Sequence, residues 1–244
     1  MATKPTPRHL SAVTPPPAGT SLDQYPLVPA GPDTDFPVVY RVHDTYNSDG
    51  SPRSPLYYSS AWEPGTAPYT GGRFDLQGSA GLGTCNTGRS PLAAIREYLG
   101  TMSHKAEISL SLLAGKSVSR IRLKHPKVLV DARVDGPGYY ADCVSDARHK
   151  GTNYVLTQSL AQSIYELGAD GNISNSSLGL TENVYLYGPA GVYEGNLEVK
   201  ETVSLIEAYR ECLTQGASLP KIIEDTQSFP GDFGGALHDS LPPI

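Results

Sequence analysis

Short apolar runs and longer helical spacings alternate along the chain. A run of apolar residues recurs at helical spacing over 157–167, and the spacing over 199–213 also predicts a helix. Four shorter runs are rich in Val, Ile, Leu and Tyr and are typical of β-strands: 37–41, 118–123, 127–131 and 183–187. Short strands mixed with two or three helices predict an α+β fold.

The clearest helix signal lies just after residue 89. Ser90 is a suitable N-cap, Pro91 occupies the first helical position, and Gly100 ends the pattern. The apolar stripe of this helix is formed by Leu92, Ile95 and Leu99. Glu97 falls on the opposite side, so periodicity alone predicts an exposed glutamate.

Composition along the chain suggests three regions. Residues 1–36 are rich in proline and lack periodicity, which predicts a disordered tail. The main domain is expected over 37–195, followed by a C-terminal helix and loose extension over 196–244. Within the main domain, a polar stretch over 47–71 is long enough to predict a functional loop.

Charge and cysteine content narrow the classes of function. The chain has 19 Lys and Arg against 25 Asp and Glu, a net charge of −6, and no basic block. Binding to nucleic acid or to an anionic membrane through bulk electrostatics is therefore not expected. No apolar run approaches the roughly 20 residues of a membrane span, and no secretory leader is visible at the N-terminus.

The cysteine and histidine patterns bear on the cellular compartment and on metal binding. Three cysteines lie far apart without a CxxC pair, which favours reduced thiols and predicts a soluble, cytoplasmic protein. The histidines and cysteines show no zinc-ligand spacing, so no metal site is expected.

Three features are left unexplained by packing. Arg41 closes the first predicted strand. The segment Gly71-Gly72-Arg73-Phe74-Asp75 places an arginine directly after a flexible pair of glycines. The polar segment 170–177 lies between a helix and a strand, where we expect a loop that displays functional groups.

In this order and spacing, these features resemble the RES domain family, which is named for its arginine, glutamate and serine. The family has a strand arginine, a GGR-aromatic-Asn motif, a helix with glutamate, a helix that begins with glutamine, and a loop with serine. The resemblance covers about residues 37–195. The matching positions are Arg41, Gly71, Gly72, Arg73, Phe74, Glu97, Gln158 and Ser176, with Ser177 as the alternative register.

Two positions depart from the family pattern. Asn86 stands where family members usually have a tyrosine, and Asp75 replaces the usual asparagine after the GGR-aromatic motif. Either another residue, such as Tyr46 or Tyr69, takes the role of the tyrosine, or turnover is altered.

The resemblance implies a fold similar to that of ADP-ribosyltransferases and activity on NAD as a substrate, with no separate cofactor. In this interpretation Glu97 holds the ribose hydroxyls and faces the positive charge that develops as the nicotinamide–ribose bond breaks. Arg41 and Arg73 bind the pyrophosphate, and backbone N–H groups of Gly71 and Gly72 assist Arg73.

The remaining candidates would bind other parts of NAD. Ser176 would hydrogen-bond a ribose or phosphate oxygen, and Asn86 would line the substrate site. Phe74 or a loop tyrosine such as Tyr69 would stack on the cationic nicotinamide ring. Taken singly, Glu97 is typical of a solvated helix residue and Arg41 of a surface ion pair. Phe74 alone is typical of a core residue and Ser176 of a turn.

The resemblance implies a toxin that consumes NAD, as a glycohydrolase or a phosphorylase, and that a protein antitoxin holds in check. Protein ADP-ribosylation is an alternative activity. A non-catalytic nucleotide-binding module is a third hypothesis, motivated by Asn86 and Asp75.

Overall fold

The computed structural model describes residues 13–59, 72–76, 81–145, 154–176 and 181–224. Two pairs of strands form small separate sheets: β3 (Tyr57–Tyr58) with β10 (Gly191–Val192), and β5 (Glu107–Ser109) with β12 (Lys221–Ile223). The strands of the main sheet are β1 (Leu27–Ala30), β2 (Val38–Asp44), β4 (Leu82–Gly88), β6 (Lys116–Leu123), β7 (Lys127–Asp131), β8 (Gly171–Asn175), β9 (Glu182–Pro189) and β11 (Leu197–Ser204). The helices are α1 (Pro91–Leu99), α2 (Ala141–Val144), α3 (Val155–Glu166) and α4 (Leu205–Thr214), with short 3-10 turns η2 (Leu22–Gln24), η3 (Gly100–His104) and η4 (Leu110–Leu112).

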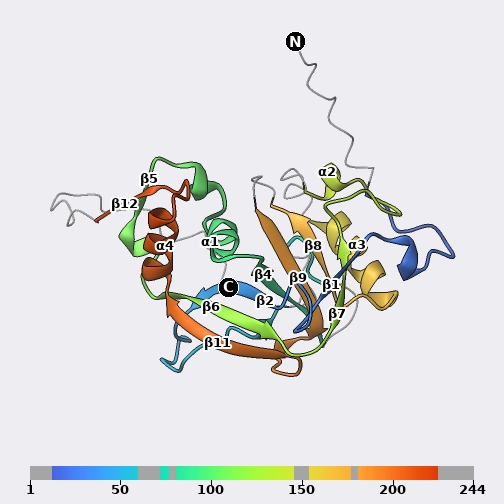
Figure 1. The fold of residues 1–244 in the computed structure, drawn as a ribbon, viewed down its shortest axis with the longest axis horizontal. Coiled ribbons are helices and arrows are strands. Elements are labelled where there is room, and N and C mark those ends of the chain that lie inside the picture. The colour runs from blue at the N-terminus through green and yellow to red at the C-terminus, as the bar shows by residue number, and fades with distance from the viewer. Residues whose placement is uncertain (1–12, 60–71, 77–80, 146–153, 177–180, 225–244) are drawn as a thin grey trace, which may run out of the picture.

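The main sheet has eight strands in the order β1-β7-β8-β9-β4-β2-β6-β11. Neighbouring strands are antiparallel, except for the parallel pair β7 and β8. Figure 1 shows a curved sheet with α1 and α4 together near one end and α2 and α3 near the other. This arrangement confirms the predicted α+β class.

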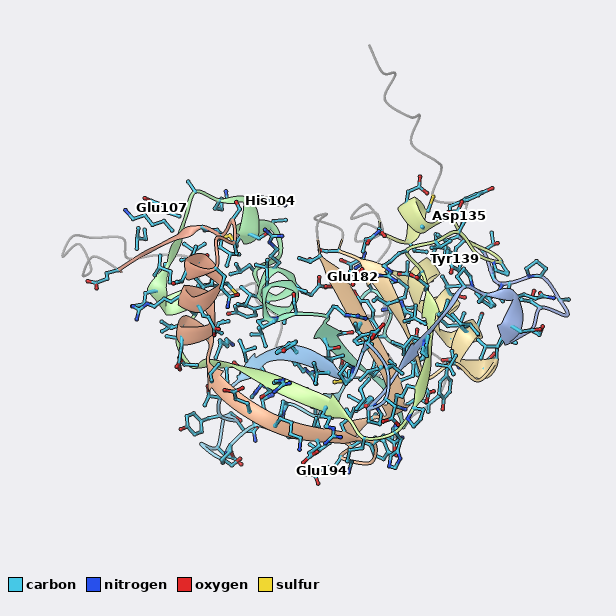
Figure 2. The ribbon with its side chains drawn as sticks, viewed as in Figure 1. His104, Glu107, Asp135, Tyr139, Glu182 and Glu194 are labelled. Atoms are coloured by element: carbon cyan, nitrogen blue, oxygen red, sulfur yellow. The ribbon has the colours of Figure 1, made fainter. Side chains whose placement is uncertain are left out.

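Three apolar clusters form the core, and side chains fill the space between sheet and helices (Figure 2). Alternate residues of a strand point to opposite faces, and β9 shows how this divides the core. Val184 and Leu186 pack in one cluster on one face, while Tyr185 and Tyr187 belong to a second cluster with α3 on the other face. A third cluster joins the apolar sides of α1 and α4.

Most elements with a strong local pattern are confirmed. Helix α1 begins where the cap predicts, because Ser90 Oγ accepts a hydrogen bond from the backbone N–H of Ala93 at 3.1 Å. Gly100 follows the helix with a φ of +53°, a conformation that glycine adopts at little cost. Strands are also present at 38–44, 116–123, 127–131 and 182–189, and α3 overlaps the helix expected over 157–167.

The helix expected over 199–213 is wrong in its first part. Residues 197–204 form the edge strand β11, which pairs with β6, and α4 begins only at Leu205. Ser204 caps α4 by accepting a hydrogen bond from the backbone N–H of Glu207 at 3.1 Å. The β-branched residues Val199, Thr202 and Val203 suit the edge strand, so the apolar spacing of α4 does not extend back through them.

The N-terminal region is more ordered than its composition suggests. Within the described part of the expected tail, β1 pairs with β7 in the main sheet. Tyr25, Ala30 and Phe36 are buried at 4%, 0% and 2% exposure. The boundary at residue 37 is therefore a correction, because these apolar side chains complete the core. The expected division at 195 is corrected too, since β11 lies beyond it in the same sheet.

The polar segment 170–177 was expected to be a loop, but most of it forms β8, inside the sheet between β7 and β9. Asn172 and Ser174 are fully buried there. Polar composition misled the prediction because these side chains face a partly polar interior. Of the stretch 47–71, residues 47–59 are described and include β3, whereas the remainder falls outside the described residues.

The described residues also bear on membrane spans, metal sites and disulfides. None of their helices is long and apolar enough to cross a membrane. No group of three or more His, Cys, Asp and Glu side chains suited to a metal ion occurs in the described part of the chain. Cys85, Cys143 and Cys212 are buried and form no disulfide.

Candidate functional site

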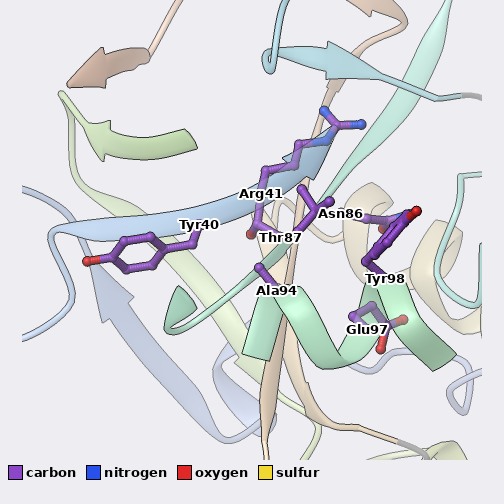
Figure 3. A pocket seen from close by; sticks show the side chains of 8 residues that line it. Tyr40, Arg41, Asn86, Thr87, Ala94, Glu97 and Tyr98 are labelled. Carbon is purple, nitrogen blue, oxygen red and sulfur yellow. The ribbon is translucent and has the colours of Figure 1, made fainter. Parts of the chain in front are cut away.

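A pocket opens where two central strands of the main sheet separate. Strands β2 and β4 pair at one position, Tyr40 with Gly88. The pocket at this separation has a volume of about 160 Å³ (Figure 3). Its lining residues come from β2, β4 and α1: Tyr40, Arg41, Val42, Asn86, Thr87, Ala94, Glu97 and Tyr98.

Helix α1 can lie this close to β4 because of Gly88. A Cβ atom at this position would lie 2.4 Å from the backbone nitrogen of Ala94, far inside van der Waals contact. The glycine therefore permits α1 to cross the end of β4. Because Glu97 lies one turn beyond Ala94, this close approach sets the height of its carboxylate above the sheet.

Glu97 is exposed and lines the pocket. Its Oε2 accepts a hydrogen bond from Nδ2 of Asn183 on β9, a side chain with only 1% exposure. A side chain that periodicity assigns to solvent is thus held at the pocket by a buried amide. A fixed, accessible carboxylate can interact with hydroxyl groups or with a positive charge in a bound ligand.

Arg41 reaches the pocket from the other side of β2. Tyr40 and Val42 face α1, so Arg41 lies on the opposite face, and in Figure 3 its guanidinium points away from Glu97. Its Nη1 donates to the Pro55 carbonyl at 2.8 Å, to the Tyr57 carbonyl, and to Cys85 Sγ at 3.2 Å. None of the hydrogen bonds among the described residues uses its Nη2 or Nε.

Arg73 occupies a different environment from the one its motif suggests. It is 6% exposed, and its guanidinium donates to the carbonyls of Val144 at 3.3 Å and Asn175 at 3.2 Å and to Tyr185 Oη at 3.0 Å. Burial opposes its charge, but Tyr185 and the negative charge of Glu97 leave its pKa raised. In this structure Arg73 is hydrogen-bonded to the protein interior, and its role as a pyrophosphate ligand stays a prediction.

Gly72, the described glycine of the Gly71-Gly72 pair, also forms hydrogen bonds within the protein. The N–H of Gly72 donates to Asp75 Oδ2 at 2.7 Å, and its carbonyl accepts from Gln158 Nε2 at 2.9 Å. Asp75 is 2% exposed, and its burial raises its pKa to about 6. Asp75 accepts the Gly72 N–H in this structure, so the predicted phosphate contact from Gly72 would require that hydrogen bond to break. Asn86 lies beside this turn, with Nδ2 3.4 Å from Asp75 Oδ1.

Phe74 belongs to the core. It has 0% exposure, and its ring centroid lies 4.6 Å from that of Tyr185. No face of the ring is open to a ligand in this structure, so the burial favours the core residue over the nicotinamide-stacking role.

The remaining candidates are only partly tested. Ser176 is 3% exposed, and its backbone N–H donates to the Thr181 carbonyl at 2.8 Å. Tyr46 is 60% exposed and does not line the pocket. Tyr69, Gly71 and Ser177 lie outside the described residues.

Comparison with known proteins addresses the resemblance directly. The sequence matches the RES domain over residues 38–204, which is more than half of the chain. The chain belongs to the RES domain family.

Other comparisons add little to the family match. One chain in the crystal structure of the M. tuberculosis MbcT–MbcA toxin–antitoxin complex is similar to this RES domain, with 14% identity and a TM-score of 0.47. That match covers 71% of this chain and 87% of the other. No curated protein matches the sequence.

The structure places three further residues of this RES domain near the site that the motifs did not identify: Asn183, Tyr185 and Tyr154. Asn183 and Tyr185 lie on the face of β9 that is turned toward Glu97 and Arg73. Tyr154, at the start of α3, has a φ of +60°, a strained conformation for a tyrosine. Burial raises the pKa of Tyr154, and the charges of Arg73 and Glu97 also act on it.

The sequence contains a signal for Asn183 but none for Tyr154. Asn183 begins an otherwise apolar run, so its polarity was a visible signal. Nothing in the sequence marks Tyr154. The charge of Glu97 nevertheless acts on Tyr154, whereas Tyr46, the described tyrosine proposed to replace the one absent at Asn86, does not line the pocket.

Proposed function

We propose that this RES domain consumes NAD by breaking the bond between nicotinamide and ribose. The observation that supports this proposal is the carboxylate of Glu97, exposed at a pocket and held there by the buried amide of Asn183. Glu97 is also the glutamate that the family pattern marks.

The chemistry explains why one fixed carboxylate matters. As the C–N bond breaks, its electron pair moves to the nicotinamide nitrogen and positive charge develops on the ribose. A carboxylate that faces the sugar stabilises that charge more in the transition state than in bound NAD. The new bond then forms from C1 of the ribose to an oxygen of water or phosphate, and a proton is released when water attacks.

The pocket size suits part of the substrate. A volume of about 160 Å³ is below the roughly 300–1,000 Å³ of typical pockets for whole ligands. It is compatible with one ring of NAD, so the rest of the dinucleotide would extend beyond the pocket. The donors of Arg41 that no described residue engages lie on the side away from Glu97 and suit a phosphate oxygen.

The acceptor can be identified from the products. Purified protein would be incubated with NAD in phosphate-free buffer and in buffer with phosphate, and the products separated by chromatography. Hydrolysis gives ADP-ribose in both buffers, whereas phosphorolysis gives a phosphorylated ADP-ribose and requires phosphate. If label from NAD appears on protein and not in a small product, the reaction is ADP-ribosyl transfer. That result would contradict both hydrolysis and phosphorolysis.

We further propose that the protein acts as a toxin and that a protein antitoxin restrains it, which family membership supports. Expression in cells without the antitoxin should lower NAD and slow growth, and Glu97→Ala should abolish both effects at equal protein level. Normal growth and NAD levels during expression of the folded wild type would contradict the toxin role.

A non-catalytic nucleotide-binding module is the second candidate. It is favoured by Asn86 at the position of the family tyrosine and by the internal engagement of Arg73 and Gly72. This alternative predicts that calorimetry detects NAD binding while no nicotinamide is released.

A further inference from the structure

We propose that Asn183 is a positioning residue of the NAD site: its buried amide nitrogen holds the Glu97 carboxylate at the pocket. This inference rests on the proposed function and extends it to a residue outside the arginine, glutamate and serine pattern.

The register of the sheet brings Asn183 to this position. In the pairing of β4 with β9, Asn183 lies opposite Gly88. Paired residues share a face of the sheet, and glycine has no side chain to separate Asn183 from α1 above it. The same glycine that admits α1 therefore leaves room for the Asn183 amide to reach Glu97.

The two ends of the amide have different partners. Nδ2 donates to Glu97 Oε2, while Oδ1 is buried and has no hydrogen-bond partner among the described residues. Rotating the amide by half a turn would place Oδ1 against the carboxylate, where two acceptors repel each other. The contact with Glu97 thus fixes the orientation and leaves Oδ1 as the unused acceptor.

An unused buried acceptor is costly in a folded protein, and buried polar atoms without a partner are uncommon. The side chain is 1% exposed, so neither bulk water nor a ligand in the pocket reaches Oδ1. The buried amide is therefore explained by its other end, the Nδ2 contact that holds Glu97.

A second unused acceptor lies nearby on the adjacent strand. Asn86 pairs in register with Tyr185, two residues from Asn183 on the same face of the sheet. Its Oδ1 is also buried without a partner among the described residues, and Asn86 lines the pocket with Glu97. Asn86 and Glu97 thus line one pocket whose polar groups suit a ligand that offers hydroxyl donors, and the ribose diol has this chemistry.

Tyr185 links this arrangement to the GGR motif. Arg73 Nη2 donates to Tyr185 Oη at 3.0 Å. Tyr185 lies two residues from Asn183 on the same face of β9, so Arg73 supports the strand that carries Asn183. This gives the motif arginine a role without direct phosphate contact.

The test compares nicotinamide release and ADP-ribose binding for the wild type, Asn183→Ala, Asn183→Asp and Asn172→Ala. Asn172 is a matched control because it is a buried asparagine on β8 with an unpartnered amide atom. Asn183→Ala should lower kcat about 100-fold, as misplacing a catalytic group does, and should weaken ADP-ribose binding in calorimetry. Asn172→Ala should lower thermal stability without either effect.

Asn183→Asp separates positioning from general stability. It retains the size and an acceptor but places a second carboxyl beside Glu97, so the two groups compete for a proton. The acid side of the pH–rate profile should move to higher pH in this variant only. A wild-type rate and pH profile in folded Asn183 variants would overturn the inference while the proposed function stands. No nicotinamide release by the wild type would instead overturn the proposed function, and the inference with it.

Discussion

At the scale of single residues, Glu97 and Arg73 show that two charged residues of one family pattern can differ in burial. Both carry charges that the family pattern marks, but Glu97 is exposed at the pocket and Arg73 is 6% exposed. Carbonyls of Val144 and Asn175 and the hydroxyl of Tyr185 use the donors of Arg73. Residue type and spacing identify such a position, but its partners come from distant segments that no local pattern records.

Asp75 carries the first prediction, which concerns stability against pH. Its pKa is raised from 3.8 to about 6 in the folded state because burial disfavours the charge. Between these values the native protein keeps a proton that the unfolded chain has lost. The stability of the wild type therefore falls as pH rises from about 4 to 6, and above that range Asp75 adds no further pH dependence.

Asp75→Asn removes this pH dependence. Asparagine keeps an acceptor for the Gly72 N–H, and its amide can pair with the unpartnered Oδ1 of Asn86 after that amide rotates. A shift of about two pKa units corresponds to about 3 kcal/mol, so the variant should gain up to this amount over the wild type by neutral pH. Urea unfolding from pH 4.5 to 8 measures the difference. Parallel curves for the two proteins would show that Asp75 does not titrate in this window.

At the scale of elements, local signals predicted well where they were self-contained. The cap at Ser90, the proline that follows it and Gly100 define α1 without help from the rest of the chain. Strand β8 and the boundary between β11 and α4 could not be predicted in this way. Their structure depends on pairing with β7, β9 and β6, and sheet pairing between distant segments overrides local composition.

The contact between α1 and β4 carries the second prediction. Gly88→Ala would force a Cβ against the Ala94 backbone, so α1 must move and Glu97 with it. We expect a loss of stability of roughly 1–3 kcal/mol together with a large fall in nicotinamide release.

Gly83→Ala is the matched control for this contact. A Cβ there would lie 2.9 Å from the carbonyl oxygens of Tyr58 and Ser59, at the opposite end of β4 from α1. Urea unfolding should show a similar loss of stability, while the rate per folded molecule should stay near that of the wild type. Equal loss of rate in both variants would mean that the position of α1 does not control the site.

At the scale of the whole molecule, the sheet extends past both expected domain boundaries. Strand β1 comes from the proline-rich region and β11 from the C-terminal region, and they form the two edges of the main sheet. Proline content suggested disorder, but Pro29 lies on an edge strand, where the lack of an N–H is tolerated. Composition averaged over 36 residues concealed a few buried apolar positions.

A chain that starts at residue 37 tests this correction. It lacks Tyr25, Ala30 and Phe36, which are buried in two core clusters. We expect it to lose cooperative thermal unfolding. Phe36→Ala in the full chain should cost about 3–5 kcal/mol, because Phe36 is 2% exposed and the Arg89 guanidinium lies 3.8 Å from its ring centroid. An unchanged melting temperature in the shortened chain would restore the boundary at 37.

The most direct measurement of the central claim is nicotinamide release from NAD by the wild type, Glu97→Gln and Glu107→Gln. Glu107 is an exposed glutamate on β5, and it does not line the pocket. Glutamine preserves size and removes only the charge that would stabilise the ribose cation. We predict release by the wild type and Glu107→Gln, and a fall of at least about 100-fold in folded Glu97→Gln. Equal release by all three proteins would contradict the assignment of Glu97.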